Sequence, residues 1–90
     1  MVIDKLTYAL PICRLHNSDR DWYHFIPSDT EQQWWVVSRD AFSVVGRSMT
    51  YYLRTAAFDS EAAARAEVAK IDNYEGVNFF IAQGKMECMR

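Results

Sequence analysis

Four pairs of adjacent aromatic residues constrain the fold of this chain more than any other feature. The pairs are Trp22-Tyr23, Trp34-Trp35, Tyr51-Tyr52 and Phe79-Phe80, and each lies in a segment that favours a β-strand. Successive side chains of a strand point to opposite faces of its sheet, so each pair places a large ring on both faces. Both faces therefore need a cover. Only one helix is predicted, so the second face must meet the N-terminal segment, another copy of the chain or a partner.

The composition predicts a single compact domain that spans residues 1 to 90. Half of the 90 residues are hydrophobic, 24% are charged, and only three Gly and two Pro occur, as in ordinary globular proteins. A core of this size is marginal without large side chains or oligomerisation, and 14% of the residues are aromatic. The formal net charge of −2 argues against a general nucleic-acid coat and against mimicry of DNA.

The two cysteines, Cys13 and Cys88, lie far apart in a chain with no recognisable signal peptide and no apolar run of transmembrane length. Because small secreted domains are usually rich in cysteine, we expect reduced thiols and a cytoplasmic protein that does not contact a membrane. Cys13 and His16 have half the spacing of a Cys₂His₂ zinc site, which His24 and Cys88 would have to complete. The second half lacks the paired spacing, so we expect no metal and no cofactor.

Alternating apolar and polar residues predict strands through most of the chain. They cover residues 3–15, 22–26, 34–38, 42–45, 49–55, 77–82 and 85–89. Pro11 would keep the first strand at a sheet edge. Some apolar residues of this segment also have helical spacing, so a helix remains an alternative for residues 3–15. Ser28 and Glu31 match a capping box, so a short helix remains an alternative for residues 28–38. Gln83-Gly84 is predicted to turn between the last two strands.

One helix is predicted, from Asp59 to Asp72. Asp59 suits the N-cap, and Glu61 and Arg65 form a correctly oriented i,i+4 pair. Short connections favour antiparallel neighbours. The predicted fold is therefore α+β, an antiparallel β-meander sheet packed on one face by a single α-helix, in the order β-β-β-β-β-α-β-β.

The face of the sheet opposite the helix is the first candidate binding site. The helix presents an apolar stripe of Ala64, Val68 and Ile71, which we expect to pack on the more apolar face. Alternation then gathers rings and cations on the other face: Trp35, Arg39, Tyr52, Arg54 and Phe80. Residues 1 to 15 could instead cover this face. A register shift by one residue would reverse the assignment of any strand.

The outer side of the helix is a second candidate surface. It carries small residues flanked by two cations: Ala62, Arg65, Ala66, Ala69 and Lys70. Small side chains allow another surface to approach closely. The high helix propensity of alanine explains the same pattern without any partner.

No motif indicates catalysis. Gly46, Gly76 and Gly84 are isolated, so no phosphate-binding loop is predicted, and no nucleophile elbow occurs. The carboxylates cluster in predicted loops, as solvated turn residues do. A chain of 90 residues also has little room to enclose an active-site pocket. We expect a protein that is not an enzyme.

A small domain with ring-rich faces and no active site is typical of accessory proteins of phages and mobile elements. In its strands, the helix start Phe58-Asp59-Ser60-Glu61-Ala62-Ala63 and the strand Val77 to Ala82, the chain resembles several small anti-CRISPR proteins. The resemblance covers residues 32 to 86 at the level of architecture, without a shared motif residue. It implies a protein-binding module that occludes a host protein or protein–nucleic acid complex, such as a Cas effector. Anti-CRISPR proteins that imitate DNA are much more acidic than this chain.

Two other functions remain open. In a nucleic-acid binder, the rings of the first candidate face would stack on bases, with Arg39 and Arg54 beside them. The acidic charge balance makes direct binding to nucleic acid the less favoured expectation. A structural homodimer would pair the ring-bearing faces or join edge strands into one sheet.

Overall fold

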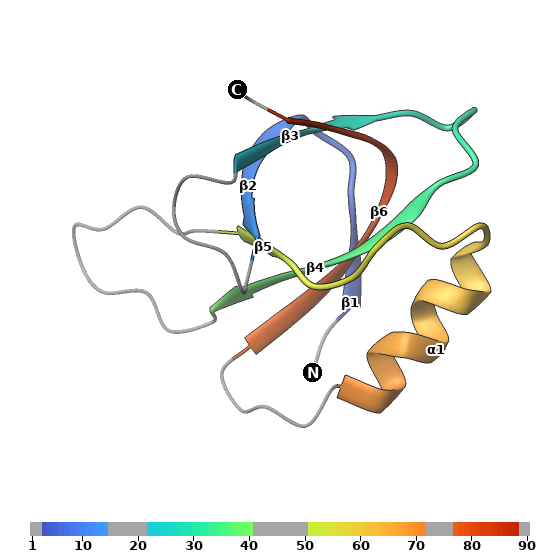
Figure 1. Cartoon of the computed structure of the whole chain (residues 1–90). Coiled ribbons are helices and arrows are strands. Elements are labelled where there is room, and N and C mark those ends of the chain that lie inside the picture. Colours follow the sequence, from blue (N-terminus) through green and yellow to red (C-terminus); the bar gives the residue numbers. More distant parts are fainter. Residues whose placement is uncertain (1–2, 15–21, 41–50, 72–76, 89–90) are drawn as a thin grey trace.

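The computed structural model describes residues 3–14, 22–40, 51–71 and 77–88. In chain order they form β1 (Ile3–Leu6), β2 (Leu10–Arg14), β3 (Trp22–Pro27), β4 (Trp34–Asp40), β5 (Tyr51–Leu53), α1 (Glu61–Ile71) and β6 (Val77–Cys88). The strands form one mostly antiparallel sheet that curls into a nearly closed barrel, with α1 packed outside it (Figure 1). The predicted α+β fold with a helix before the last long strand is confirmed.

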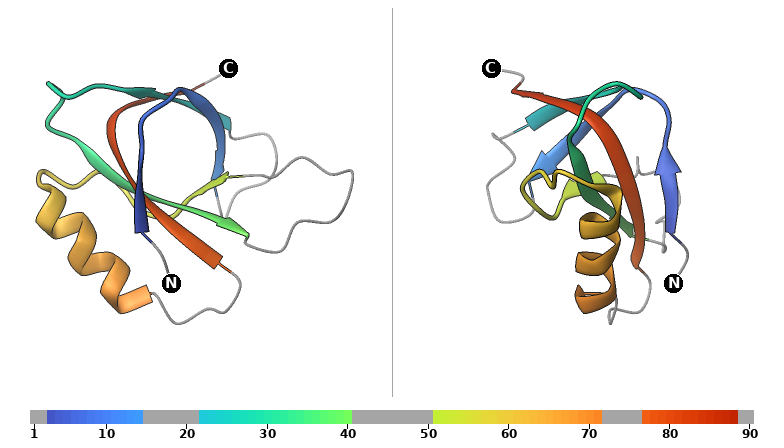
Figure 2. Two further views of the ribbon diagram at one scale, coloured as in Figure 1. Left: turned by 180° about the vertical axis from the view of Figure 1, so that it is seen from behind. Right: turned by 90° about the vertical axis from the view of Figure 1, so that its right-hand side faces the viewer.

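The barrel closes because β6 belongs to two parts of the sheet. Residues 77–83 of β6 pair with β4, and residues 84–88 pair with β3. β2 and β5 complete the circuit between β3 and β4. β1 pairs only with the first half of β6, so among the described strands it is the one with a single strand neighbour (Figure 2).

The strand connections differ from a simple meander. The β2–β3 and β4–β5 pairs are antiparallel neighbours in the chain, whereas β1–β6 and β2–β5 are parallel pairs between distant segments. The predicted turn at Gln83-Gly84 is wrong, because β6 continues through it. Gly84 has a φ of 151°, and a glycine lets a strand bend sharply where a turn was expected. The predicted strand at 42–45 lies outside the described residues.

The N-terminal segment forms two strands rather than one strand or a helix. Three of its apolar residues are buried as the alternation predicts: Leu6, Leu10 and Ile12. Tyr8 lies in the link between β1 and β2 and is 54% exposed. β2 pairs with β3 on one side, and on the other side only its last two residues pair with β5. Pro11 lies before those two residues, where β2 pairs with β3 alone. In the segment after Ser28, the strand prediction is confirmed and the helix alternative is not adopted.

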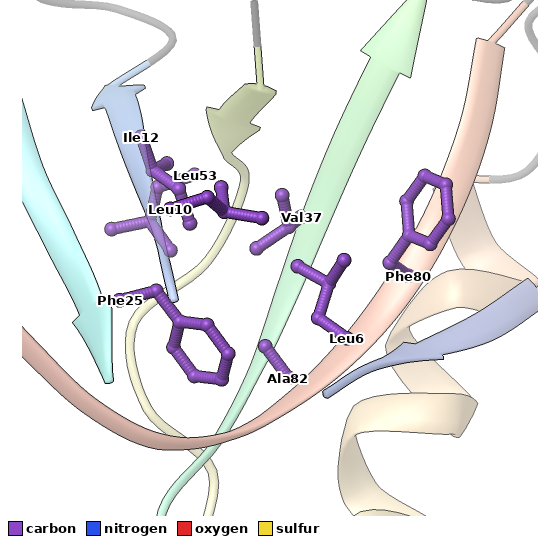
Figure 3. Packing of buried hydrophobic residues seen from close by; sticks show 8 residues of the cluster. All are labelled: Leu6, Leu10, Ile12, Phe25, Val37, Leu53, Phe80 and Ala82. Atoms are coloured by element: carbon purple, nitrogen blue, oxygen red, sulfur yellow. The ribbon is translucent and has the colours of Figure 1, made fainter. Parts of the chain in front are cut away.

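Two hydrophobic clusters lie on opposite sides of β4 and β6. The first fills the barrel interior: Leu6, Leu10, Ile12, Phe25, Val37, Leu53, Phe80 and Ala82 (Figure 3). The second joins the sheet to α1: Val36, Ala64, Val68, Phe79 and Ile81. The predicted helix stripe is therefore confirmed at its two buried positions, with Ile71 packed beside them. The pair Phe79-Phe80 places one ring in each cluster, as the alternation of a strand requires.

The helix begins at Glu61, and its N-cap is Ser60 rather than Asp59. The Ser60 hydroxyl accepts a hydrogen bond from the Ala63 amide at 3.1 Å, which is the geometry of an N-cap. Both residue types suit this position, so the local sequence did not separate them. The predicted ion pair between Arg65 and Glu61 is present, with a distance of 2.9 Å from Nε to Oε2.

Replacing Ser60 with alanine is expected to lower the free energy of unfolding by about 1 kcal/mol, because the first turn of the helix loses a hydrogen-bond acceptor. Urea denaturation measures this change. Asp59→Ala is the matched control, and a smaller loss is expected because Asp59 is exposed outside the helix. A larger loss for Asp59→Ala would contradict the assignment of the cap.

Candidate functional site

The five residues predicted to share one open face are divided between two environments. Trp35, Arg39 and Phe80 lie on the face turned away from α1, as predicted. Tyr52 and Arg54 lie on the helix side instead. Tyr52 pairs with Ser38, and the Arg54 guanidinium carbon lies 6.0 Å from the ring centroid of Phe79, which belongs to the cluster under the helix.

The error has a physical cause in β5. Tyr51 and Leu53, not Tyr52 and Arg54, contact the barrel interior, so the assignment of this strand is shifted by one residue. Both faces of the sheet are buried against apolar residues, and apolar character therefore does not distinguish them. The far face is also no open platform, because side chains of β1 and β2 cover it, which is the alternative that the sequence left open.

The second predicted surface, on the outer side of α1, is exposed as expected. Its residues Ala62, Arg65, Ala66, Ala69 and Lys70 all face solvent. Lys70 Nζ lies 4.0 Å from Glu67 Oε2, and Arg65 pairs with Glu61, so both of these ion pairs stay within the helix. Nothing in these contacts indicates a ligand.

The residues considered for zinc do not converge where the structure describes them. His24 is opposite Glu87 in the β3–β6 pair and Cys88 is opposite Tyr23, so His24 and Cys88 leave the sheet on opposite faces. Among the described residues, no group of three His, Cys, Asp or Glu side chains could hold a metal ion. His16 and the side chain of Cys13 lie outside what the structure describes.

The structure reveals a pocket that no pattern in the sequence predicts. Its volume is about 490 Å³, and it lies where the ends of β1 and β3 meet beside β6 and the start of α1. The lining residues are Lys5, Leu6, Thr7, Pro27, Ser28, Asp29, Trp34, Glu61, Ile81 and Gln83. This volume is in the range of sites that take a small molecule or a large side chain.

The pocket combines apolar lining with a charged rim. Trp34 is half-buried, and Ile81 is almost completely buried. At the rim, Lys5 Nζ lies 2.9 Å from Glu61 Oε1. The hydrogen bonds from Lys5 and then Arg65 lower the pKa of Glu61, because they stabilise its ionised form. The rim therefore presents an ion pair at neutral pH rather than an isolated charge.

One wall of the pocket is held in place by Gln83. Its Nε2 donates to the carbonyl oxygen of Glu31 at 2.7 Å and to that of Asp29 at 3.4 Å. The Ser28 amide donates to the carbonyl oxygen of Gln83 at 3.1 Å. These bonds tie the loop between β3 and β4 to β6. The pocket therefore exists before any ligand binds, which lowers the entropy cost of binding.

A second polar group lies on the interior face, around Arg39. Its Nη1 donates to the Tyr51 hydroxyl at 3.0 Å, and the Tyr51 and Tyr8 hydroxyls are 3.1 Å apart. The guanidinium carbon lies 5.5 Å from the ring centroid of Tyr51 and 5.3 Å from that of Phe80. The hydrogen bond with Tyr51 is the main cause that raises the pKa of Tyr8.

Comparisons with known proteins assign no family to this chain. No protein-family model matches it, and neither a curated protein nor a solved structure shows significant similarity. In the part of the chain that the structure describes, no helix is long and apolar enough to cross a membrane.

Proposed function

We propose that this protein is a non-enzymatic protein-binding module that captures an extended segment of a partner along β1 and holds one partner side chain in the adjacent pocket. Such binding occludes the partner's surface, which is the mode of action that the resemblance to small anti-CRISPR proteins implies. The observation that carries the proposal is the juxtaposition of an open strand edge with a preformed pocket lined by the same strand.

The edge of β1 supplies backbone hydrogen-bonding groups. Its residues pair with β6 on one side, and no other described strand pairs with it. An extended peptide adds to such an edge through main-chain hydrogen bonds. β1 is only four residues long and carries two exposed charged residues, Asp4 and Lys5. A short edge that carries charges discourages indiscriminate strand pairing, so binding there would also depend on the adjacent pocket.

The pocket would supply specificity. Side chains of an added strand alternate between faces, so one of them can enter a recess beside β1. Its contacts would be the indole of Trp34 and the buried side chain of Ile81, which favour a large apolar or aromatic group. Because Lys5 and Glu61 neutralise each other at the rim, the site does not require a charged partner residue.

The nucleic-acid alternative depended on an exposed sheet face of aromatic rings with two arginines beside them. Phe80 is only 8% exposed, and Trp35 packs against the barrel core with its indole N–H donating to the Gly84 carbonyl at 3.0 Å. Arg54 lies on the other side of the sheet. Bases would therefore find no continuous stacking surface on this face.

A random peptide library displayed on phage tests the proposal directly. Panning against the full chain is expected to enrich peptides that share a large apolar residue. Thr7→Trp, at the exposed lip of the pocket, should weaken their binding about thirtyfold, the effect of losing an anchor worth about 2 kcal/mol. Ala66→Trp, on the outer face of α1, is the matched control and should leave the affinity unchanged. Isothermal titration calorimetry measures both.

Three results would refute the proposal. The first is equal binding by wild type and Thr7→Trp, and the second is a loss confined to Ala66→Trp, which would move the site to the helix. The third is a stable dimer, detected by sedimentation, that Thr7→Trp dissociates, which would make a second copy the occupant of β1. Binding of an oligonucleotide at physiological salt with micromolar affinity would instead favour the nucleic-acid alternative.

A further inference from the structure

Arg39 carries a positive charge that the described part of the protein does not neutralise. The ion pairs among the described residues involve Lys5, Arg65 and Lys70, not Arg39. The Nε of Arg39 is buried and has no hydrogen-bond partner. A buried donor without an acceptor is costly, and more so when it is charged. Arginine cannot relieve this cost by losing its proton.

Aromatic rings stabilise the Arg39 charge only in part. The faces of Tyr51 and Phe80 both lie within cation–π distance of the guanidinium. Tyr51 also accepts the hydrogen bond from Nη1. These contacts hold the guanidinium in one orientation while leaving its Nε–H edge unsatisfied. An oriented guanidinium edge with aromatic walls matches the geometry of an oxyanion.

Tyr8 connects this group to solvent. Its side chain is more than half exposed, and its hydroxyl is hydrogen-bonded to that of Tyr51. The Arg39 charge also acts on the Tyr8 hydroxyl. Tyr8 is therefore the member of the cluster that can move aside without disturbing the hydrophobic core.

We propose that Arg39 is the centre of a carboxylate-binding site, which opens when Tyr8 turns away from Tyr51. The carboxylate accepts hydrogen bonds from the Nε–H edge of Arg39. A carboxylate is favoured over phosphate because its single negative charge matches the one guanidinium that these contacts hold in place. This site is separate from the pocket beside β1, so its test is independent of the test of the proposed function.

The carboxylate of Asp4 is a group of this chain that could itself occupy the proposed site. Asp4 pairs with Phe80 in the β1–β6 register and so lies on the same sheet face as Arg39, yet Asp4 and Arg39 form no ion pair in the structure. If Asp4 occupied the site in solution, an external carboxylate would bind only after Asp4 is neutralised. Asp4→Asn therefore separates an internal counter-ion from an external ligand.

Titration with sodium acetate tests the carboxylate site, with sodium chloride used to keep the ionic strength constant. In ¹H–¹⁵N spectra of the full chain, the Nε–H resonance of Arg39 is expected to shift until it saturates. Followed at the Tyr51 amide, Arg39→Lys should bind acetate at least about tenfold more weakly, since a lysine cannot offer the bidentate edge. Tyr8→Ala should bind it several-fold more tightly, because the site no longer has to open.

The two variants thus change the affinity in opposite directions, which a purely structural cluster would not do. Four results would overturn the proposal: no saturable shift in the wild type, an equal response to chloride alone, tighter binding of inorganic phosphate than of acetate, or acetate binding that appears only in Asp4→Asn. The wild-type titration decides the question even if a variant fails to fold.

Discussion

Replacing Gly84 with alanine is expected to destabilise the protein by about 3 kcal/mol or more, since backbone strain and overpacking each cost about 1 to 3 kcal/mol. A Cβ at this position would lie 2.1 Å from the carbonyl oxygen of Ile26 and 3.0 Å from Cε1 of Phe25. The φ of 151° is also one that residues with a side chain rarely adopt. The closest contact of the new methyl group is therefore with backbone, which no side-chain rotation can relieve.

The chain around Gly84 has little freedom to accommodate the change. Its amide donates to the Gln33 carbonyl at 3.0 Å, and its own carbonyl accepts from the indole of Trp35 at 3.0 Å. A shift of β6 at this point would break these bonds and loosen the Pro27–Gly84 pairing that joins β6 to β3. Because the wall of the pocket beside β1 depends on the same region, the proposed peptide binding should decline together with stability.

Denaturation followed by circular dichroism measures the effect. Lys85→Ala is the matched control, because the next residue of β6 is exposed and its loss should cost within about 0.5 kcal/mol. If Gly84→Ala proved as stable as Lys85→Ala, β6 could not bend against β3 as the structure has it.

Replacing Phe25 with alanine is expected to cost about 3 to 5 kcal/mol, the usual range for removing a buried phenylalanine ring. Phe25 is completely buried in the barrel interior, in one cluster with side chains from β1, β2, β4, β5 and β6 (Figure 3). The backbone of a barrel cannot collapse easily into the space left by the ring. We therefore expect the cavity to add its full contribution to the loss of stability.

His24→Ala provides the comparison, because His24 precedes Phe25 on the opposite face of β3 and is only half-buried. The two variants should differ by at least about 2 kcal/mol in urea denaturation. A cost below about 1 kcal/mol for Phe25→Ala would mean that the interior of the barrel is not packed around this ring.

The helix is the element that the sequence determined best. Its apolar stripe and the Glu61–Arg65 pair depend on residues three or four positions apart, so local spacing is sufficient to predict them. Its first residue was misplaced because Asp59 and Ser60 both suit a cap. The structure assigns the cap to Ser60 through its bond from the Ala63 amide, and Phe58 is bridged to Trp34 through two backbone hydrogen bonds just before the helix.

The strands were predictable as segments, because alternation is also a local property, but their partners were not. The parallel pairs β1–β6 and β2–β5 join distant parts of the chain, and the continuation of β6 through Gly84 depends on close contact with β3. The shift by one residue in β5 has a related cause. A barrel interior and a helix-covered exterior are both apolar, so the polar side that normally marks the outside of a strand is missing.

The candidate sites belong wholly to the tertiary structure. The pocket unites β1, the end of β3, the start of β4, the first residue of α1 and the middle of β6. The Arg39 cluster joins β4, β5, β6 and the link after β1. No spacing along the chain predicts these contacts, because they join segments that only the paired strands of the sheet bring together. The amino-acid sequence therefore determined which segments become strands and helix, while closure of the sheet decided which side chains share a site.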